Sequence, residues 1–307
     1  MRAYRLTLLF VILFALAAPA TAGPFTSVIV YGDSLSDNGN LYAVTGIPGA
    51  PYWQGRRSNG PVAVEDLAAN LGVPLIDAAW IGATTGLGNY ADGGTPTSLG
   101  AYGFPGMEAQ FAATALSVGP IAPSSLFIIW GGPNDFLSPS PLDGGDPIKT
   151  ADRAVADLLA LVGDVQGLGA HHILVPGMPD LGLTPYFRSI GMGAFGSSLT
   201  DYFNAELLAG LPSGVMYYDT AALMRDIVAN PGAYGFTNVT DPCFDPAVPT
   251  LCGNPNSYLF FDDFHPTAHA QEIVGQMFTE TAVPEPATII LVAPAFALLA
   301  AARRFRR

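Results

Sequence analysis

Basic residues are few in this sequence. Only 12 of its 307 residues are lysine or arginine, against 25 aspartates and glutamates, so the formal net charge is −13. Six of the twelve lie within the first five and the last five residues, which leaves the central part more acidic still. Proteins that bind nucleic acids or anionic lipid surfaces carry a clustered excess of positive charge. The composition therefore predicts no nucleic-acid partner.

Cysteine is also scarce, because the chain contains only Cys243 and Cys252. A metal site built on this pair would need further ligands at characteristic spacings, and the sequence offers none. His265 and His269 are four residues apart, but the H-E-x-x-H pattern of zinc proteins is missing. We therefore expect no metal and no other cofactor. In an oxidising compartment the two cysteines are expected to form a disulfide that closes a short loop.

Long apolar runs occur at the two ends of the chain. Residues 1–22 have the three parts of a signal peptide: two arginines near the start, the apolar run Leu8–Ala18, and Ala20-Thr21-Ala22 as a cleavage pattern. The alternative, an N-terminal helix of a cytosolic protein, does not explain these parts in this order. The first 22 residues therefore predict export from the cytoplasm.

The C-terminal segment, residues 283–307, is patterned in the same way. The motif Val283–Thr288 precedes the apolar run Ile289–Ala302, and four of the last five residues are arginine. This run is shorter than the ~20 residues of a usual membrane-spanning helix, and the arginines would stay on the cytoplasmic side. The segment resembles a bacterial PEP-CTERM sorting signal; a plain C-terminal anchor is the alternative.

The resemblance to a sorting signal implies a Gram-negative host, an exosortase-type processing enzyme as partner, and removal of the tail. The predicted location is the periplasm, the outer cell surface or the extracellular matrix, with transient anchoring of the protein in the membrane by its C-terminal segment.

Residues 23–282 lie between these two signals and have the length of one α/β domain. Five short apolar runs are predicted to be strands: Ser27–Tyr31, Pro74–Ala78, Leu126–Trp130, His172–Val175 and Val215–Tyr218. Six segments have helical patterns: Pro61–Leu71, Met107–Ser117, Thr150–Gly167, Thr200–Leu211, Ala221–Asn230 and Ala268–Thr281. Uninterrupted apolar strands that alternate with helices predict a parallel sheet of about five strands in a three-layer α/β/α sandwich.

A serine follows the first predicted strand directly. The strand runs into Gly32-Asp33-Ser34, which places Ser34 at the carboxyl edge of the sheet, where open parallel sheets bind ligands. The segment is not the G-x-S-x-G turn of α/β-hydrolases, because Ser36 stands in place of the second glycine. A serine at the end of a strand is more often a turn residue, so its interpretation as a nucleophile depends on a base elsewhere in the chain.

A histidine with a nearby carboxylate occurs toward the other end of the chain. Asp262 precedes His265 by three residues, so one turn can hold the two side chains together. A serine hydroxyl becomes nucleophilic when an imidazole takes its proton, and a carboxylate on the other ring nitrogen fixes the tautomer. The alternative is a solvated acidic turn before the predicted helix Ala268–Thr281.

Two glycine-containing loops could supply hydrogen-bond donors. Asn134 follows the most apolar strand in Gly132-Pro133-Asn134, and Gly93-Gly94 lies in the long segment Gly82–Gly106. Backbone N–H groups without a Cβ beside them, and an asparagine amide, can bind the negative oxygen of a tetrahedral intermediate. The alternative for both loops is simple turn formation.

Together these segments carry a family resemblance. Gly32–Leu35, Asn89–Gly94, Gly132–Asp135 and Asp262–Pro266 occur in the order typical of SGNH/GDSL hydrolases, and Arg56–Pro61 is similar to their esterase/lipase branch. The resemblance spans most of the domain and implies a flavodoxin-like sheet. It also implies that Ser34 is the nucleophile, that His265 is the general base, and that Asp262, rather than the adjacent Asp263, orients it.

For the oxyanion hole, the resemblance implies the N–H of Ser34, the N–H of Gly94 and the side chain of Asn134, with Gly93 as the alternative to Gly94. The predicted activity is ester hydrolysis through an acyl-enzyme, on a small-molecule, lipid or polysaccharide ester. A deacylase or acyltransferase of extracellular polysaccharide, or a non-catalytic surface protein on the same scaffold, are the alternatives.

Overall fold

A parallel sheet of five strands forms the centre of the computed structural model, which describes residues 25–137 and 142–283. Its strands are β1 (Val28–Gly32), β2 (Leu75–Asp77), β3 (Leu126–Trp130), β4 (His172–Pro176) and β5 (Met216–Tyr218). Their order is β2-β1-β3-β4-β5, and every neighbouring pair is parallel. The five predicted strands agree with these bounds to within one residue, so the predicted fold class is confirmed.

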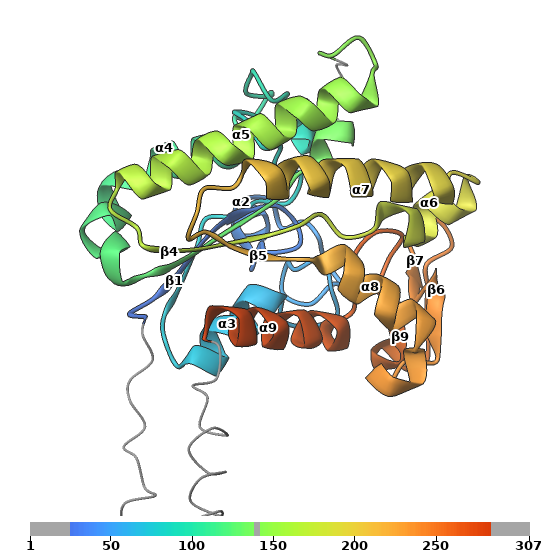
Figure 1. Ribbon diagram of the computed structural model, residues 1–307. Helices are drawn as coiled ribbons and strands as arrows, with labels where there is room; N and C mark the ends of the chain where they lie inside the picture. The colour runs from blue at the N-terminus through green and yellow to red at the C-terminus, as the bar shows by residue number, and fades with distance from the viewer. Residues whose placement is uncertain (1–24, 138–141, 284–307) are drawn as a thin grey trace, which may run out of the picture.

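Helices cover both faces of the sheet (Figure 1). On one face lie α4 (Met107–Val118), α5 (Pro147–Gly167) and α7 (Gly193–Gly210); on the other lie α3 (Ala63–Leu71), α8 (Thr220–Ala229) and α9 (Ala268–Ala282). Successive strand residues point to opposite faces. In β1, Ile29 and Tyr31 therefore pack into the cluster beneath α4, α5 and α7, whereas Val28 and Val30 pack with α3 and α9. This two-sided burial explains why β1 and β3, which are buried at every position, carry no charged residue.

The helices differ from the predictions mainly at their starts. α5 begins three residues earlier than expected, because Pro147 opens the helix and the Asp146 side chain accepts from the Ile148 N–H. α7 begins seven residues early, through a glycine- and serine-rich turn without helical periodicity. Two short helices were not predicted: α2 (Asn40–Thr45) and α6 (Pro185–Ser189).

Short 3-10 turns connect several of these elements. They are η1 (Tyr90–Asp92), η2 (Gly119–Ser124), η3 (Pro133–Leu137), η4 (Leu181–Leu183), η5 (Pro231–Tyr234) and η6 (Pro255–Ser257). The predicted signal peptide and, apart from Val283, the predicted sorting signal lie outside the described residues. Within residues 25–137 and 142–283, no helix has both the length and the apolar character that crossing a membrane requires.

The strand order creates a switch point between β1 and β3. The chain leaves β1 toward β2 on one side and returns to β3 on the other, and a crevice forms outside the carboxyl ends of strands at such a point. Gln110 of α4 fixes the end of β1 there, because its amide donates to the Gly32 carbonyl at 2.8 Å and accepts from the Gly32 N–H at 3.0 Å. The switch point therefore marks where a ligand site is expected.

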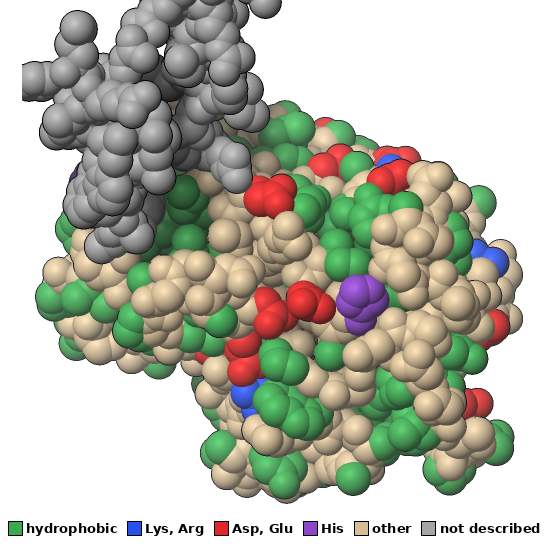
Figure 2. Space-filling view, turned by 90° about the horizontal axis from the view of Figure 1, so that it is seen from below, with side chains coloured by type: hydrophobic (Ala, Val, Ile, Leu, Met, Phe, Trp, Pro, Cys, Tyr) green, Lys and Arg blue, Asp and Glu red, His purple; other side chains and the backbone are tan. Residues whose placement is uncertain are grey.

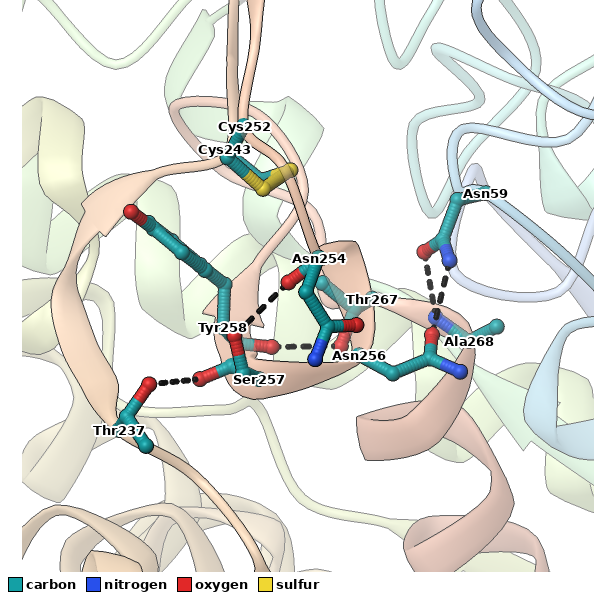
Figure 3. Close-up of a disulfide and its surroundings, with 10 residues drawn as sticks. All are labelled: Asn59, Thr237, Cys243, Cys252, Asn254, Asn256, Ser257, Tyr258, Thr267 and Ala268. Atoms are coloured by element: carbon teal, nitrogen blue, oxygen red, sulfur yellow. Dashed lines mark hydrogen bonds between the residues drawn. A yellow bond between two sulfur atoms is a disulfide. The ribbon is translucent and has the colours of Figure 1, made fainter.

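A small second layer of strands lies beyond the main sheet. β6 (Asn238–Pro242) pairs with β9 (Tyr258–Phe260), and β7 (Phe244–Asp245) pairs with β8 (Thr250–Leu251). The predicted disulfide between Cys243 and Cys252 is present in this hairpin, with the two Cα atoms 4.9 Å apart. Figure 3 shows it above the turn that leads into β9, where the Thr267 hydroxyl donates to the Tyr258 carbonyl at 2.7 Å.

The hairpin disulfide predicts a measurable loss of stability when it is removed. A cross-link that closes a short loop lowers the entropy of the unfolded chain and typically contributes about 2–4 kcal/mol. The double variant Cys243→Ser/Cys252→Ser is therefore expected to unfold at lower urea concentration, with a free energy of unfolding lower by that amount. Wild-type protein in reductant serves as the control and should show the same shift. An unchanged urea midpoint in both samples would contradict the prediction.

The surface of the described residues matches the acidic composition. Seen from the side of α3 and α9, acidic side chains are more prominent than basic ones (Figure 2). Several of the basic side chains that are present are engaged in ion pairs, such as Arg56 with Glu65 at 2.6 Å and Arg225 with Asp180 at 2.6 Å.

Candidate active site

Ser34 lies at the switch point, directly after β1. The turn that carries it is held by Asp33, whose carbonyl accepts from the Ser36 N–H and the Asp37 N–H and whose carboxylate accepts from the Leu35 N–H. The Oγ of Ser34 lies 2.8 Å from Nε2 of His265. Within hydrogen-bonding distance, an imidazole can take the hydroxyl proton.

The imidazole of His265 is oriented by Asp262. Its Nδ1 lies 2.8 Å and 2.9 Å from the two carboxylate oxygens of Asp262. The same carboxylate accepts from the N–H groups of Phe264 and His265, so the three-residue spacing forms one compact turn. Burial by itself raises the pKa of Asp262, but the nearby His265 and these hydrogen bonds outweigh it and lower the pKa to about 2. The carboxylate is therefore charged at neutral pH.

Asp263, the alternative to Asp262, takes a different place. Within the described part of the chain its carboxylate makes no hydrogen bond, and its carbonyl accepts from the Tyr186 N–H at 3.0 Å. The structure therefore brings Ser34, His265 and Asp262 together, and it does not bring the Asp263 carboxylate to the imidazole.

Asn134 reaches the same pocket from the end of β3. It belongs to η3, is buried, and lies where β3 ends beside β1. Its Nδ2 donates to the Ala83 carbonyl at 2.9 Å and makes a longer contact of 3.3 Å with a carboxylate oxygen of Asp33. Burial raises the pKa of Asp33 to about 6. The second amide hydrogen of Asn134 thus makes only this long contact with Asp33, and a stronger acceptor can take its place.

Gly94, the predicted backbone donor, does not lie at this site. It is absent from the pocket lining, and its N–H donates to the Asn89 carbonyl at 2.8 Å inside its own loop. A Cβ on Gly94 would lie 2.6 Å from the Asn89 nitrogen, so the glycine is required by close packing of the loop. The alternative, Gly93, donates to the Tyr90 carbonyl at 3.1 Å and ends η1 with a φ of +82°.

Gly82 occupies the position that was expected for Gly94. It lines the pocket together with Ser34 and Asn134 and follows β2 at the same edge of the sheet. Among the described residues, neither the Gly82 N–H nor the Ser34 N–H has a hydrogen-bond acceptor. A Cβ on Gly82 would lie 2.4 Å from the Asn89 side chain, and its φ of +83° favours glycine. Its place four residues after a predicted strand was a signal available in the sequence.

The loop around Gly82 is fixed on both sides. The Ile81 N–H donates to the buried Asp37 carboxylate at 2.8 Å, and the Ile81 carbonyl accepts from the Asn89 side chain at 2.9 Å. The Gly82 carbonyl accepts from the Tyr90 N–H at 3.0 Å. The free N–H of Gly82 is therefore held in a fixed direction.

Tyr52 also belongs to the site, and the sequence did not indicate its contact with Asp262. Its hydroxyl donates to Asp262 Oδ2 at 2.7 Å. Burial and the negative charge of Asp262 raise its pKa, so the hydroxyl keeps its proton. Its ring packs edge-on against Phe244 of the disulfide hairpin and against Phe261, the residue before Asp262. Only tertiary packing joins these segments, 210 residues apart in the case of Tyr52 and Asp262.

One pocket of about 300 Å³ joins these groups. Its polar lining includes Ser34, Gly82, Asn134, Asp262, His265 and Arg57. Its apolar lining includes Leu35, Ile81, Leu181, Leu223, Met224, Ile227, Leu259 and Val274. An apolar cavity with a few convergent polar groups is typical of a small-molecule site.

The chain is similar to several known proteins. The family model named GDSL-like Lipase/Acylhydrolase matches residues 28–278. A GDSL esterase/lipase of Arabidopsis thaliana is 26% identical, covering 90% of this chain and 97% of that protein. Esterase EstA of Pseudomonas aeruginosa is 28% identical over 84% of this chain but only 47% of its own length.

Two further proteins are similar to the chain, one in sequence and one in structure. A phosphatidylcholine-sterol acyltransferase of Aeromonas hydrophila is 28% identical over 80% of this chain and 73% of that protein. Among solved structures, Axe2, an acetylxylan esterase from Geobacillus stearothermophilus, covers 86% of this chain and 94% of its own, with a TM-score of 0.45 and 14% identity.

Proposed function

The chain belongs to the GDSL-like lipase/acylhydrolase family, and we propose that it hydrolyses carboxylic esters through a covalent acyl-enzyme on Ser34. The observation that carries the proposal is the continuous contact from Ser34 Oγ to His265 Nε2 and from His265 Nδ1 to Asp262. In this arrangement an imidazole, fixed in one tautomer, can activate the hydroxyl.

The reaction has two halves. In the first, Ser34 Oγ attacks the ester carbonyl carbon while its proton passes to His265 Nε2. The tetrahedral intermediate then breaks its carbon–oxygen bond to the alcohol, which leaves with the proton from His265. In the second, His265 takes a proton from water, the hydroxide attacks the acyl carbonyl, and Ser34 departs with that proton.

We assign the oxyanion hole to the N–H groups of Ser34 and Gly82 and to the side chain of Asn134. Gly82 replaces Gly94 in this assignment because the Gly94 N–H donates within its own loop. During the reaction the negative oxygen takes the amide hydrogen of Asn134 that otherwise makes the 3.3 Å contact with Asp33. Donors that are fixed before the reaction stabilise the transition state without reorganisation.

Replacement of Asn134 by alanine is expected to lower kcat by roughly 10²- to 10³-fold with little change in KM, because one oxyanion donor contributes about 2.7–4 kcal/mol to the transition state. Steady-state kinetics on p-nitrophenyl butyrate measure the effect. The Asn134 amide also holds the Ala83 carbonyl, so circular dichroism and thermal unfolding of the variant are needed as a control. A folded variant with unchanged kcat would contradict the assignment.

The general experiment for the proposed function is turnover of p-nitrophenyl esters of increasing acyl length. A stoichiometric burst of p-nitrophenol ahead of the steady state supports an acyl-enzyme. The apolar pocket lining predicts that butyrate and longer acyl groups react faster than acetate. Absence of turnover on every ester of the series would count against the proposed function.

We further propose that the protein acts outside the cytoplasm and that an exosortase-type enzyme removes its C-terminal segment. The sequence patterns of residues 1–22 and 283–307 support this proposal, and the hairpin disulfide is of a kind that persists in oxidising compartments. Intact-mass measurement of protein recovered outside the cytoplasm tests it: a mass that still includes residues 289–307 would refute removal of the tail.

A second candidate function is acyl transfer from the acyl-enzyme to an alcohol in place of water. The 28% identity to the phosphatidylcholine-sterol acyltransferase of Aeromonas hydrophila supports acyl transfer as a candidate. Addition of an alcohol acceptor during ester turnover distinguishes the two. A transferase yields mainly the new ester, whereas a hydrolase yields mainly the free acid.

A further inference from the structure

Arg57 is a pocket residue without an anionic partner. It lies in the loop between α2 and α3 and lines the same pocket as Ser34 and His265. Among residues 25–137 and 142–283, no carboxylate oxygen lies within 4.0 Å of its guanidinium, and its buried Nε has no hydrogen-bond partner. A buried cationic donor without a partner is costly, so its retention calls for a partner that arrives from outside.

The other basic residues of the described chain behave differently. Arg56, Arg153 and Arg225 are each ion-paired with at least one carboxylate, at distances between 2.6 and 3.6 Å. Lys149 and Arg188, which are not ion-paired within the described residues, are exposed to solvent, which satisfies their charges. In a chain with a net charge of −13, carboxylates are abundant. Among the arginines of the described residues, Arg57 is the one that is partly buried and has no carboxylate partner.

The surroundings of Arg57 compensate its charge only in part. Its guanidinium lies 5.1 Å from the centroid of the Tyr52 ring, a cation–π contact of modest strength. Two of the three carboxylates that line the pocket serve other donors: Asp262 accepts from His265, Phe264 and Tyr52, and Asp33 accepts from Leu35 and Asn134. The third, Asp263, forms no ion pair with Arg57 among the described residues. Arg57 also lies close enough to the Tyr52 hydroxyl to oppose the rise of its pKa, but the Nε hydrogen of Arg57 has no partner and is available to a ligand.

We propose that Arg57 binds a carboxylate or phosphate on the alcohol part of the substrate, so that the natural substrate is an anionic ester. This inference rests on the proposed function. The apolar side of the pocket, formed by Leu181, Leu223, Met224, Ile227 and Leu259, suits the acyl chain, which leaves the charge to the alcohol. The planar guanidinium presents paired N–H groups that match the two oxygens of a carboxylate or phosphate.

Three butyrate esters of para-substituted phenols test the proposal. One phenol is neutral and carries a methyl ester, one carries a carboxylate, and one carries a phosphate. The measured quantity is kcat/KM for each charged ester divided by that for the neutral ester, after correction for the rates of hydroxide hydrolysis. Wild-type enzyme is expected to favour at least one charged ester by roughly 10- to 100-fold at low salt. The ester that is favoured tells carboxylate recognition from phosphate recognition.

Arg57→Gln is expected to lower that ratio roughly 10-fold or more, and Arg56→Gln is the matched control. Arg56 is adjacent in sequence and paired with Glu65 outside the pocket lining, so its variant should keep the wild-type ratio. Active-site titration by the phenol burst corrects each variant for its folded fraction. A wild-type ratio near one for both charged esters, or the same ratio in Arg57→Gln as in wild type, would overturn the proposal.

These outcomes separate the inference from the proposed function. Continued turnover of the neutral ester without any charge preference in the wild-type enzyme, or with an unchanged preference in Arg57→Gln, overturns the role of Arg57 alone. Absence of turnover on all three esters, or turnover that survives Ser34→Ala, overturns ester hydrolysis at Ser34. An equal loss on charged and neutral esters in Arg57→Gln also contradicts anion binding, since it assigns Arg57 to the support of Tyr52.

Discussion

Ser34→Ala is expected to lower kcat/KM for p-nitrophenyl butyrate by roughly 10⁴- to 10⁶-fold and to abolish the burst of p-nitrophenol. The Oγ that forms the acyl bond is removed, and no other hydroxyl among the described residues contacts Nε2 of His265. The remaining rate over water would come from substrate binding and the oxyanion donors. Stopped-flow and steady-state absorbance at the same enzyme concentration measure both effects.

Two controls make this result specific. Ser34 is buried, and alanine is smaller, so thermal unfolding should show that the variant remains folded. His265→Ala should lose activity to a similar extent, and the double variant should lose little more, because the two residues act as one unit. Full activity in a folded Ser34→Ala variant would refute the proposed nucleophile.

Asp262→Asn is expected to lower kcat by roughly 10⁴-fold at neutral pH. The amide is nearly isosteric, but its NH₂ group cannot accept from the ring N–H of His265. The imidazole then takes the tautomer that places a hydrogen on Nε2, toward Ser34, and it can no longer accept the hydroxyl proton. The change also removes the charge that stabilises the histidine cation during the reaction.

Asp263→Asn is the matched control for this substitution. The two aspartates are adjacent and face the same pocket, but the Asp263 side chain makes no hydrogen bond to His265 among the described residues. Its variant should keep kcat to within a few-fold of wild type. Similar rates in Asp262→Asn and Asp263→Asn would contradict the assigned roles. Kinetics of both variants on the same ester, with thermal unfolding as a folding check, decide the comparison.

Much of the fold followed from local patterns. Val28–Gly32 and Leu126–Trp130 carry no charged residue, because both strands are covered on both faces. The segment 193–199 was missed as helix, since glycine and serine weaken the periodicity and contacts with η4 stabilise it instead. The start of α7 thus depended on contacts that a local pattern does not contain.

The site was predictable where a residue and its support are neighbours in sequence. Asp262 and His265 share one turn, so their contact could be anticipated from spacing. The family resemblance pointed to Gly94, with the adjacent Gly93 as the alternative, and Gly82 was not singled out. The direction of an N–H, however, depends on the path of the loop: Asn89 takes the Gly94 donor and, through its side chain, anchors Ile81 beside Gly82. The contact of Tyr52 with Asp262 could not be predicted for the same reason, because only tertiary packing brings the two residues together.

The contact between Ser34 and His265 joins residues 231 positions apart, one near the start of the fold and the other shortly before its last helix, α9. A ribosome therefore exposes the serine long before the histidine is made. If Ser34 is the nucleophile, a chain that ends before His265 carries it without the proposed base. In the proposed mechanism the serine is therefore activated only after the segment that carries His265 has been made and has packed beside β1.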